Sequence, residues 1–347
     1  MQMEPPAQFL RNFSLHLRLI PIESITVKEA EIRPQNLLDR YMELSARDGA
    51  ELNKDFFKTI PCPGCGEQNS DLKFKKNGFS YQSCKSCFSL YCSPRPSSEQ
   101  LSGLYSESES STYWSQVFFP AVQEPRREKL FRPKAKKIAK LIQDKGIRVG
   151  KICDVGAGHG LFLEELRSEL SEEMSLFAIE PDGTSSKILR DKGFEVLRAL
   201  VEESSEWAGK FDFIICSEVI EHVFDANQFL ASLSRLLAPG GYCLVTGLGC
   251  EGYDVLTLGE HSKAVSPPHH LNFLSHQGFE KAFKRNGFSS VSIETPGKLD
   301  LDIVLNSKTP SDFAEAIQRR GSEAMEAFQS FLQEFNLSSH VWVLAQK

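Results

Sequence analysis

The chain has 347 residues, of which 41% are apolar, and its formal net charge is −6. This length favours one main domain with smaller attachments, and the apolar content can support a sizeable core. The mildly acidic balance excludes a strong overall attraction to nucleic acid or to an anionic membrane, so any basic surface must be local.

The N-terminus and the cysteine content indicate in which cellular compartment the protein is expected. Met1 to Leu10 carries Glu4 and a Pro5-Pro6 pair in place of the basic start and apolar core of a secretory signal. No apolar run approaches the roughly 20 residues that span a bilayer. The nine cysteines suit a reducing compartment better than a disulfide framework. We therefore expect a cytoplasmic protein that does not insert into a membrane.

Three segments precede the main domain. Residues 1–58 mix an alternating apolar stretch from Phe13 to Leu19 with a helical stretch near Leu37 to Leu44, and they carry no recognisable chemistry. Residues 59–96 contain clustered cysteines and end in a turn-prone run of serine and proline. Residues 97–145 are predicted to form a linker and a helical lead-in to the main domain. Within them, the Ser/Glu-rich stretch 106–112 is expected to be a linker or a mobile loop, and a basic helix is expected at about 128–145.

The main domain, residues 146–347, alternates predicted strands and helices. The strands are expected at 152–155, 176–179, 194–197, 211–216, 242–246, 291–294 and 340–344. The helices are expected near 161–170, 185–191, 226–237 and 277–286, with a long helical insert at about 308–336. This alternation predicts an α/β fold with a doubly wound, mostly parallel seven-stranded sheet.

The cysteine pairs predict a metal site. Cys62-Pro63-Gly64-Cys65 and Cys84-Lys85-Ser86-Cys87 are two C-x-x-C pairs separated by 18 residues, the spacing of a four-cysteine zinc ribbon. A redox role would need a C-x-x-C pair after a strand of a thioredoxin-like unit, which the pattern lacks. Four protein ligands leave no open position, so we expect structural Zn²⁺ on Cys62, Cys65, Cys84 and Cys87.

A glycine-rich turn follows the first strand of the main domain. In Asp154-Val155-Gly156-Ala157-Gly158-His159-Gly160, the glycines let the backbone approach a ligand closely and present helix N-terminal amides to it. The dinucleotide pattern G-x-G-x-x-G does not fit, because Leu161 stands three positions after Gly158. The D-x-G-x-G-x-G spacing instead resembles motif I of class I, Rossmann-like, S-adenosylmethionine-dependent methyltransferases.

This resemblance implies a cofactor site. Glu180 ends the second strand, 26 residues after Asp154, where a carboxylate can accept hydrogen bonds from two ribose hydroxyls. The alternative is a solvated strand end. The run from Phe211 to Val223 is similar to the fourth strand and active-site loop of the same family. The resemblance therefore implies S-adenosylmethionine as cofactor, with contacts from Asp154, Gly156, Gly158, Gly160, Glu180, Ser217 and Glu218.

Three histidines are the candidate catalytic residues. His222 lies in the loop after the fourth strand, at the position of a histidine base in the sugar methyltransferases that this chain resembles. The alternative is a hydrogen-bonded histidine in the wall of the site. His269 and His270 fall where this family builds its acceptor site, and they could supply a second base or orient the acceptor.

Two families place a zinc ribbon before such a domain. Four stretches resemble bacterial sugar and small-molecule methyltransferases of surface-saccharide and antibiotic pathways: Tyr91 to Pro96, Tyr113-Trp114, Arg126-Arg127-Glu128 and the late run from Thr295 to Asp300. This resemblance implies a sugar or nucleotide-sugar acceptor. The alternative is a ribosomal RNA guanine methyltransferase, suggested by ribbon lysines interleaved with Phe74, Phe79 and Tyr81. The acidic chain makes a nucleic-acid partner the weaker hypothesis. A non-catalytic binding module is the third alternative, and intact motif I argues against it.

Overall fold

The computed structural model describes residues 27–171 and 174–347, so the predicted stretch from Phe13 to Leu19 lies outside the described residues. A seven-stranded sheet forms the centre of the molecule, in the order β10-β11-β8-β7-β4-β5-β6. Its strands are β4 (Lys151–Val155), β5 (Ser175–Ile179), β6 (Glu195–Leu197), β7 (Phe211–Ser217), β8 (Leu237–Leu248), β10 (Ser290–Glu294) and β11 (His340–Gln346). The strands from β8 to β6 are parallel, and β11 is antiparallel to both neighbours. This confirms the predicted fold class.

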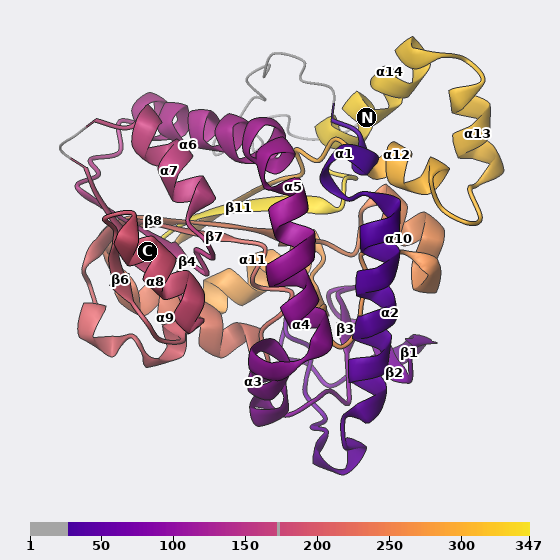
Figure 1. Cartoon of the computed structure of the whole chain (residues 1–347), viewed down its shortest axis with the longest axis horizontal. Helices are drawn as coiled ribbons and strands as arrows, with labels where there is room; N and C mark the ends of the chain where they lie inside the picture. The colour runs from indigo at the N-terminus through magenta and orange to yellow at the C-terminus, as the bar shows by residue number, and fades with distance from the viewer. Residues whose placement is uncertain (1–26, 172–173) are drawn as a thin grey trace, which may run out of the picture.

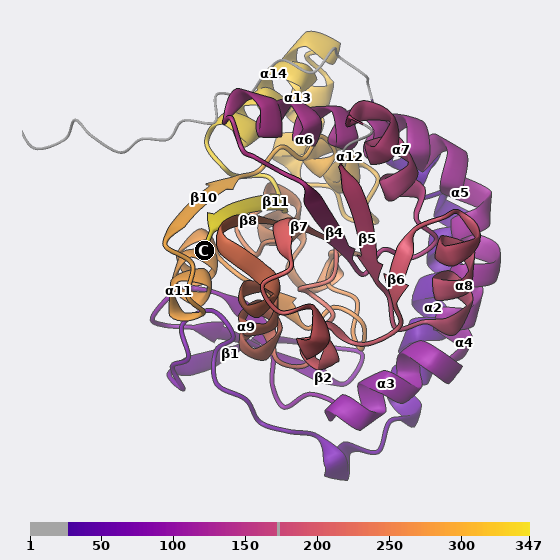
Figure 2. The same cartoon turned by 90° about the vertical axis from the view of Figure 1, so that its left-hand side faces the viewer.

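Helices cover both faces of the sheet (Figure 2). They are α6 (Arg132–Asp144), α7 (Leu161–Glu169) and α8 (Gly183–Asp191) on one face, and α9 (Ala226–Leu236) and α11 (His276–Arg285) on the other. Alternate residues of β7 face opposite layers: Phe213 packs with α6 and α7, whereas Ile214 packs with α9 and α11. Burial on both faces explains why the parallel strands are almost continuously apolar.

An N-terminal layer of helices stands across the carboxyl ends of the parallel strands (Figure 1). It contains α1 (Glu29–Ile32), α2 (Gln35–Glu51), α3 (Ser98–Glu107), α4 (Glu109–Tyr113) and α5 (Phe119–Arg126). The run continues through the π-helical turns η2 (Trp114–Phe118) and η3 (Arg127–Phe131) into α6.

The predicted linker or mobile loop at residues 106–112 is wrong, because this segment belongs to α3 and α4. Serines that suggested a loop act as helix caps: the Ser97 hydroxyl accepts from the Gln100 N–H, and the Ser108 hydroxyl accepts from the Ser111 N–H. Ser110 is itself buried against the rest of the molecule. A polar composition was therefore compatible with ordered, packed helices.

The cysteine-rich segment shares a sheet with the main domain. Its strands β1 (Ser70–Lys76), β2 (Phe79–Cys84) and β3 (Leu90–Cys92) are antiparallel, and β3 pairs with β9 (Asn272–Phe273) from the C-terminal half of the chain. Residues 59–96 therefore do not form a separate sheet, because β3 also pairs with a strand from the C-terminal half of the chain. The bounds of the four predicted segments stay predictions.

The predicted helical insert consists of separate helices that project from the sheet (Figure 1). They are α13 (Asp312–Gln318) and α14 (Ser322–Glu334), and Gly321, with a φ of 91°, breaks the run between them. A further helix, α12 (Asp300–Leu305), precedes the predicted insert. The remaining elements are α10 (Tyr253–Leu258), η1 (Lys54–Phe56), η4 (Val201–Glu203), η5 (Ser205–Trp207) and η6 (Gly259–His261). Across residues 27–171 and 174–347, we find no helix with the length and apolar character that crossing a membrane requires.

Candidate active site

The turn between β4 and α7 contains three glycines with positive φ angles: 76° at Gly156, 52° at Gly158 and 74° at Gly160. Residues with a side chain rarely adopt this conformation. A Cβ at Gly156 would lie 2.6 Å from Val219, and one at Gly160 would lie 2.5 Å from Leu189. A Cβ at Gly158, by contrast, would meet no described atom within 4 Å. Gly158 therefore borders open space at the carboxyl end of β4, where a ligand can approach the backbone.

Two buried carboxyl groups flank this turn. Glu180 follows β5, and its carboxylate accepts hydrogen bonds from the backbone N–H groups of Gly158 and Asp182 at 2.7 and 2.9 Å. Asp154 is 3% exposed, and its Oδ1 atom has no hydrogen-bond partner among the described residues. Burial raises the pKa of Asp154 to about 7, although the Lys134 ammonium opposes the shift. A buried acceptor without a donor is destabilising, so Oδ1 is suited to a donor from a bound molecule.

A hydrogen-bonded cluster lies at the carboxyl ends of β7 and β8. Lys134 reaches in from α6 and donates to the hydroxyls of Ser217 and Thr246 at 2.7 and 2.9 Å. Thr246 donates in turn to Glu218 at 2.8 Å. Burial disfavours the ionised form of Glu218, but His340 and Lys134 together hold its pKa below the usual value. The cluster therefore carries both an ammonium and a carboxylate.

His222 lies just after β7 and faces α3. Its Nδ1 atom is 2.8 Å from the Tyr105 hydroxyl, and that hydroxyl donates its proton to the His269 carbonyl at 3.2 Å. The hydroxyl has one proton, so when it donates to the His269 carbonyl its oxygen accepts from His222 Nδ1–H, and in that tautomer the ring lone pair is on Nε2. Burial lowers the pKa of His222 well below its usual value, and His270 and His269 lower it further. The ring is therefore a neutral imidazole at neutral pH.

The other two histidines have different surroundings. The Nε2 atom of His269 lies 2.9 Å from the Ser110 hydroxyl, and the ring stacks on Tyr41 with centroids 5.6 Å apart. His270 Nδ1 donates to the Ala264 carbonyl at 2.6 Å, and its ring centroid is 4.7 Å from that of His222. His269 is thus held between helices, whereas His270 Nε2, beside His222, has no hydrogen-bond partner within the part of the chain that the structure describes.

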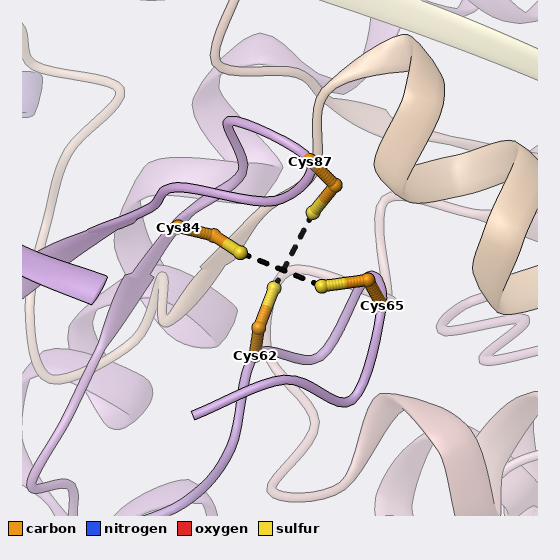
Figure 3. A group of neighbouring side chains, drawn as sticks. All are labelled: Cys62, Cys65, Cys84 and Cys87. Carbon is orange, nitrogen blue, oxygen red and sulfur yellow. Dashed lines mark hydrogen bonds between the residues drawn. The ribbon is translucent and has the colours of Figure 1, made fainter. Parts of the chain in front are cut away.

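The four cysteines of the C-x-x-C pairs come together as predicted from their spacing. Figure 3 shows their sulfurs pointing toward one another, with all ligand atoms within 4.8 Å. The Cys62–Cys87 and Cys65–Cys84 sulfurs are 3.5 and 3.4 Å apart. Tetrahedral zinc with Zn–S bonds of about 2.3 Å needs sulfurs about 3.8 Å apart, so a small outward shift would fit the ion. Cys92 is fully buried in an apolar cluster and does not belong to this group.

Comparison with known proteins assigns the central part of the chain. Residues 126–293 match the family described as methyltransferase domain. This segment is similar to a methyltransferase domain. It contains the glycine turn, both flanking carboxyl groups, the β7–β8 cluster and the three histidines. The finding supports S-adenosylmethionine-dependent methyl transfer, and it leaves the acceptor open.

Known relatives match part of the chain rather than the whole of it. A ubiquinone biosynthesis O-methyltransferase from Caulobacter sp. (strain K31) is 33% identical over 102 residues, which cover 28% of this chain and 40% of that protein. The human mitochondrial ubiquinone biosynthesis O-methyltransferase is 36% identical over 109 residues, 28% of each chain. The chain thus spans less than half the length of these curated relatives. A solved plantazolicin methyltransferase in complex with SAH is 14% identical, with a TM-score of 0.48, over 72% of this chain and 94% of that one.

Several residues at this edge of the methyltransferase domain were missed from the sequence. Lys134 and Tyr105 bind Ser217 and His222 from helices far away in the chain, and His340 reaches Glu218 from β11. No local spacing marks them. The sequence marked Arg126 only as part of Arg126-Arg127-Glu128, which resembles a run in sugar and small-molecule methyltransferases.

Arg95 is a further missed residue, and it links the ribbon to the methyltransferase domain. Its guanidinium is fully buried and donates to the carbonyls of Cys92, Phe224 and Leu271 at 2.8, 2.9 and 3.1 Å. These carbonyls belong to the ribbon, to the loop after His222 and to the loop after His270. Burial lowers the pKa of Arg95 to about 10, which leaves it charged at neutral pH. One side chain therefore ties three segments around the histidines.

Two of the three ribbon aromatics that suggested RNA binding are buried. Phe79 and Tyr81 are 1% and 0% exposed and pack in the apolar cluster under the ribbon sheet. Of the interleaved lysines, Lys76 donates to the Ser262 carbonyl at 2.7 Å, and Lys85 pairs with Asp71 at 2.9 Å. The patch that suggested RNA binding is therefore wrong as a base-stacking platform.

Proposed function

We propose that this protein transfers a methyl group from S-adenosylmethionine to a small-molecule acceptor, a sugar or nucleotide-sugar intermediate. The proposal rests above all on the open space at Gly158, with the Glu180 carboxylate beside it and the unpartnered Asp154 Oδ1 nearby. When bound, the cofactor supplies an electrophilic methyl group on a sulfonium.

The residues around Gly158 suit such a cofactor. The Glu180 carboxylate has lone pairs for two ribose hydroxyls, and Asp154 Oδ1 can accept from the methionine part through water or directly. Ser217 and Glu218 are proposed to border the same ligand from the end of β7. Gly156 and Gly160 keep the turn close to its neighbours, so the contact surface is offered by Gly158.

His222 is the proposed general base. Its Nε2 lone pair is free at neutral pH, and Tyr105 holds the ring by its other nitrogen. A hydroxyl acceptor must lose its proton as the methyl group arrives, and a neutral imidazole can take that proton at Nε2. His270 is the proposed second histidine, because its Nε2 is also unengaged, while His269 is proposed to position the loop.

The acceptor class rests on two supports. The resemblance of the ribbon and flanking motifs favours a sugar-like molecule, and the two relatives above are named O-methyltransferases, which favours an oxygen acceptor. The zinc-ribbon RNA methyltransferase remains the alternative, weakened by the buried ribbon aromatics. Incubation with labelled S-adenosylmethionine and nucleotide sugars, phenols or RNA decides among them by which one becomes labelled.

We also propose one structural Zn²⁺ on Cys62, Cys65, Cys84 and Cys87. All four sulfurs are engaged in one compact group, so the ion would have no open position for substrate.

Replacing Glu180 by glutamine should weaken binding of S-adenosylhomocysteine, the product that shares the ribose. Each lost hydrogen bond to a charged carboxylate is worth about 1.5–3 kcal/mol, so the dissociation constant should rise roughly 10- to 100-fold. Isothermal calorimetry measures this. Asp212→Asn is the matched control, because Asp212 accepts two backbone N–H bonds at the opposite, amino end of β7. Equal affinity in Glu180→Gln and wild type would contradict the site.

Replacing Tyr105 by phenylalanine should lower turnover without changing cofactor affinity. The variant loses one hydrogen bond that orients His222, worth about 1 kcal/mol, so turnover should fall roughly fivefold. Steady-state kinetics at saturating acceptor measures it. Tyr253→Phe serves as control, because it removes a hydroxyl of α10 that lies 3.4 Å from the Ser311 hydroxyl. If the two variants behave alike, Tyr105 does not position the base.

A further inference from the structure

Two arginines, Arg33 and Arg126, add positive charge around the candidate base. Among the described residues, neither Arg33 nor Arg126 forms an ion pair or a side-chain hydrogen bond, and the Nε atom of Arg126 is buried. The adjacent Arg127 shows the usual arrangement, with carboxylates of Glu164 and Glu165 at 2.8 and 2.9 Å. Arg126 as a whole is half-buried, but a buried N–H without an acceptor is costly, so its unpartnered Nε points to a ligand that supplies one.

The aromatic surroundings hold Arg126 in place. Its guanidinium carbon lies 5.8 Å from the Trp114 ring centroid and 5.9 Å from that of Phe119. These rings can stabilise the cation through their π faces, but they accept no conventional hydrogen bond. The five N–H donors of the side chain therefore remain for another group.

Both arginines belong to the edge that carries the methyl-transfer residues. Arg33 follows α1, which lies beside α5 and its Arg126 (Figure 1). The Arg33 charge lowers the pKa of Arg126, after burial, and it also contributes to the low pKa of His270. Glu218 is the carboxylate that both guanidiniums sense, and it already accepts from Thr246.

The charge balance of this edge favours an anion. Arg33 and Arg126 are guanidiniums, and burial lowers the pKa of the Lys134 ammonium beside them. His340 and Lys134 hold the pKa of Glu218 below its usual value, whereas burial raises the pKa of Glu221 and of Glu29 and so disfavours their charged forms. The neighbouring histidines are neutral at pH 7 because burial depresses their pKa values. A cationic amine acceptor would therefore be repelled, and a dianion would match the two free guanidiniums.

We propose that Arg126 and Arg33 bind a phosphoryl group of the methyl acceptor, so that the substrate is a phosphorylated small molecule. The proposal rests on the proposed function, because it places the phosphoryl group beside the residues assigned to methyl transfer. The planar donor forks of two arginines suit the several oxygens and double charge of a phosphoryl group, whereas a monocarboxylate would neutralise only one of them.

The test uses inorganic pyrophosphate as the probe. The full-length protein, saturated with S-adenosylhomocysteine at low ionic strength, is titrated with pyrophosphate in a calorimeter. We expect binding by the wild type, and a dissociation constant at least about tenfold higher in Arg126→Gln and in Arg33→Gln. Arg126→Lys keeps the positive charge but loses the planar fork of donors, so its dissociation constant should lie between those of the wild type and Arg126→Gln. Arg132→Gln, an exposed arginine paired with Glu165, is the control that should match wild type.

Several results would overturn the assignment. The first is that the wild type does not bind pyrophosphate, and the second is that it binds malonate more tightly than pyrophosphate. The third is that Arg126→Gln binds pyrophosphate as the wild type does but binds S-adenosylhomocysteine more weakly. The last result would assign Arg126 to the carboxylate of the cofactor. Thermal melting verifies that each variant folds, and Arg126→Lys carries the test if the glutamine variant does not. Failure of the wild type to bind S-adenosylhomocysteine would count against the proposed function instead. In that case, a pyrophosphate titration of the protein without S-adenosylhomocysteine still tests the anion site.

Discussion

Replacing His222 by asparagine should lower turnover by about 10²- to 10⁴-fold, the usual contribution of a positioned general base. The affinity for S-adenosylhomocysteine should stay within about twofold, because the proposed cofactor contacts come from the glycine turn and Glu180. Single-turnover kinetics and calorimetry measure the two quantities. His261→Asn is the matched control, since its side chain is 69% exposed in η6 and touches none of the candidate site residues.

The pH dependence gives an independent measure of the same base. Because burial lowers the pKa of His222, the ring is already deprotonated at pH 7 and becomes protonated only well below pH 6.5. Turnover of the wild type should therefore be flat above pH 6.5 and fall on the acid side with a midpoint clearly below it.

Other outcomes for His222 would reassign the chemistry. Turnover within about threefold of wild type in His222→Asn would move proton removal to His270, or would mean an acceptor that needs no base. Loss of both turnover and cofactor affinity would make His222 a wall residue of the site.

Removal of the proposed zinc should inactivate the enzyme as well as unfold the ribbon. We expect one equivalent of zinc in protein purified without chelator, and its loss in Cys62→Ser. Structural zinc contributes roughly 10–16 kcal/mol to the folding of small zinc modules, so the ribbon should not fold without it. The effect should reach the histidines, because β3 pairs with β9 and Arg95 binds carbonyls on both loops. Elemental analysis, turnover and cofactor affinity measure the three consequences.

The expected pattern separates this coupling from general unfolding. Turnover should fall by at least about tenfold, whereas S-adenosylhomocysteine should still bind, because β4 and β5 form the glycine-turn site without ribbon residues. Cys92→Ser is the control within the ribbon, and it should retain its zinc because Cys92 lies outside the four-sulfur group. Full turnover in zinc-free protein would show that the ribbon folds or functions independently.

The features that the sequence predicted well are local ones. The order of strands and helices after Lys151 follows from apolar periodicity, and the turn at Gly156 to Gly160 follows from positive φ angles that only glycine adopts easily. The four cysteines were identified from two short spacings, because two residues between ligands set the width of each C-x-x-C turn. In each case the deciding residues are neighbours in the chain.

Composition misled the prediction where burial was decisive. The serine-rich segment at 106–112 was predicted to be a linker or loop, yet Ser108 caps α4 and Ser110 is buried beside His269. The ribbon lysines and aromatics suggested RNA binding, yet the rings face the core. Residue type alone does not say which side of a strand or helix is covered.

The sequence by itself determined the methyltransferase-like sheet, the glycine turn and the cysteine group. Only the tertiary structure decided which side chains surround the candidate base. Tyr105 is 117 positions from His222, and Lys134 is 83 positions from Ser217. Such contacts depend on how the N-terminal helices pack across the ends of the strands, and that packing is set by many weak apolar contacts over the whole core, which leave no pattern in the chain around either partner.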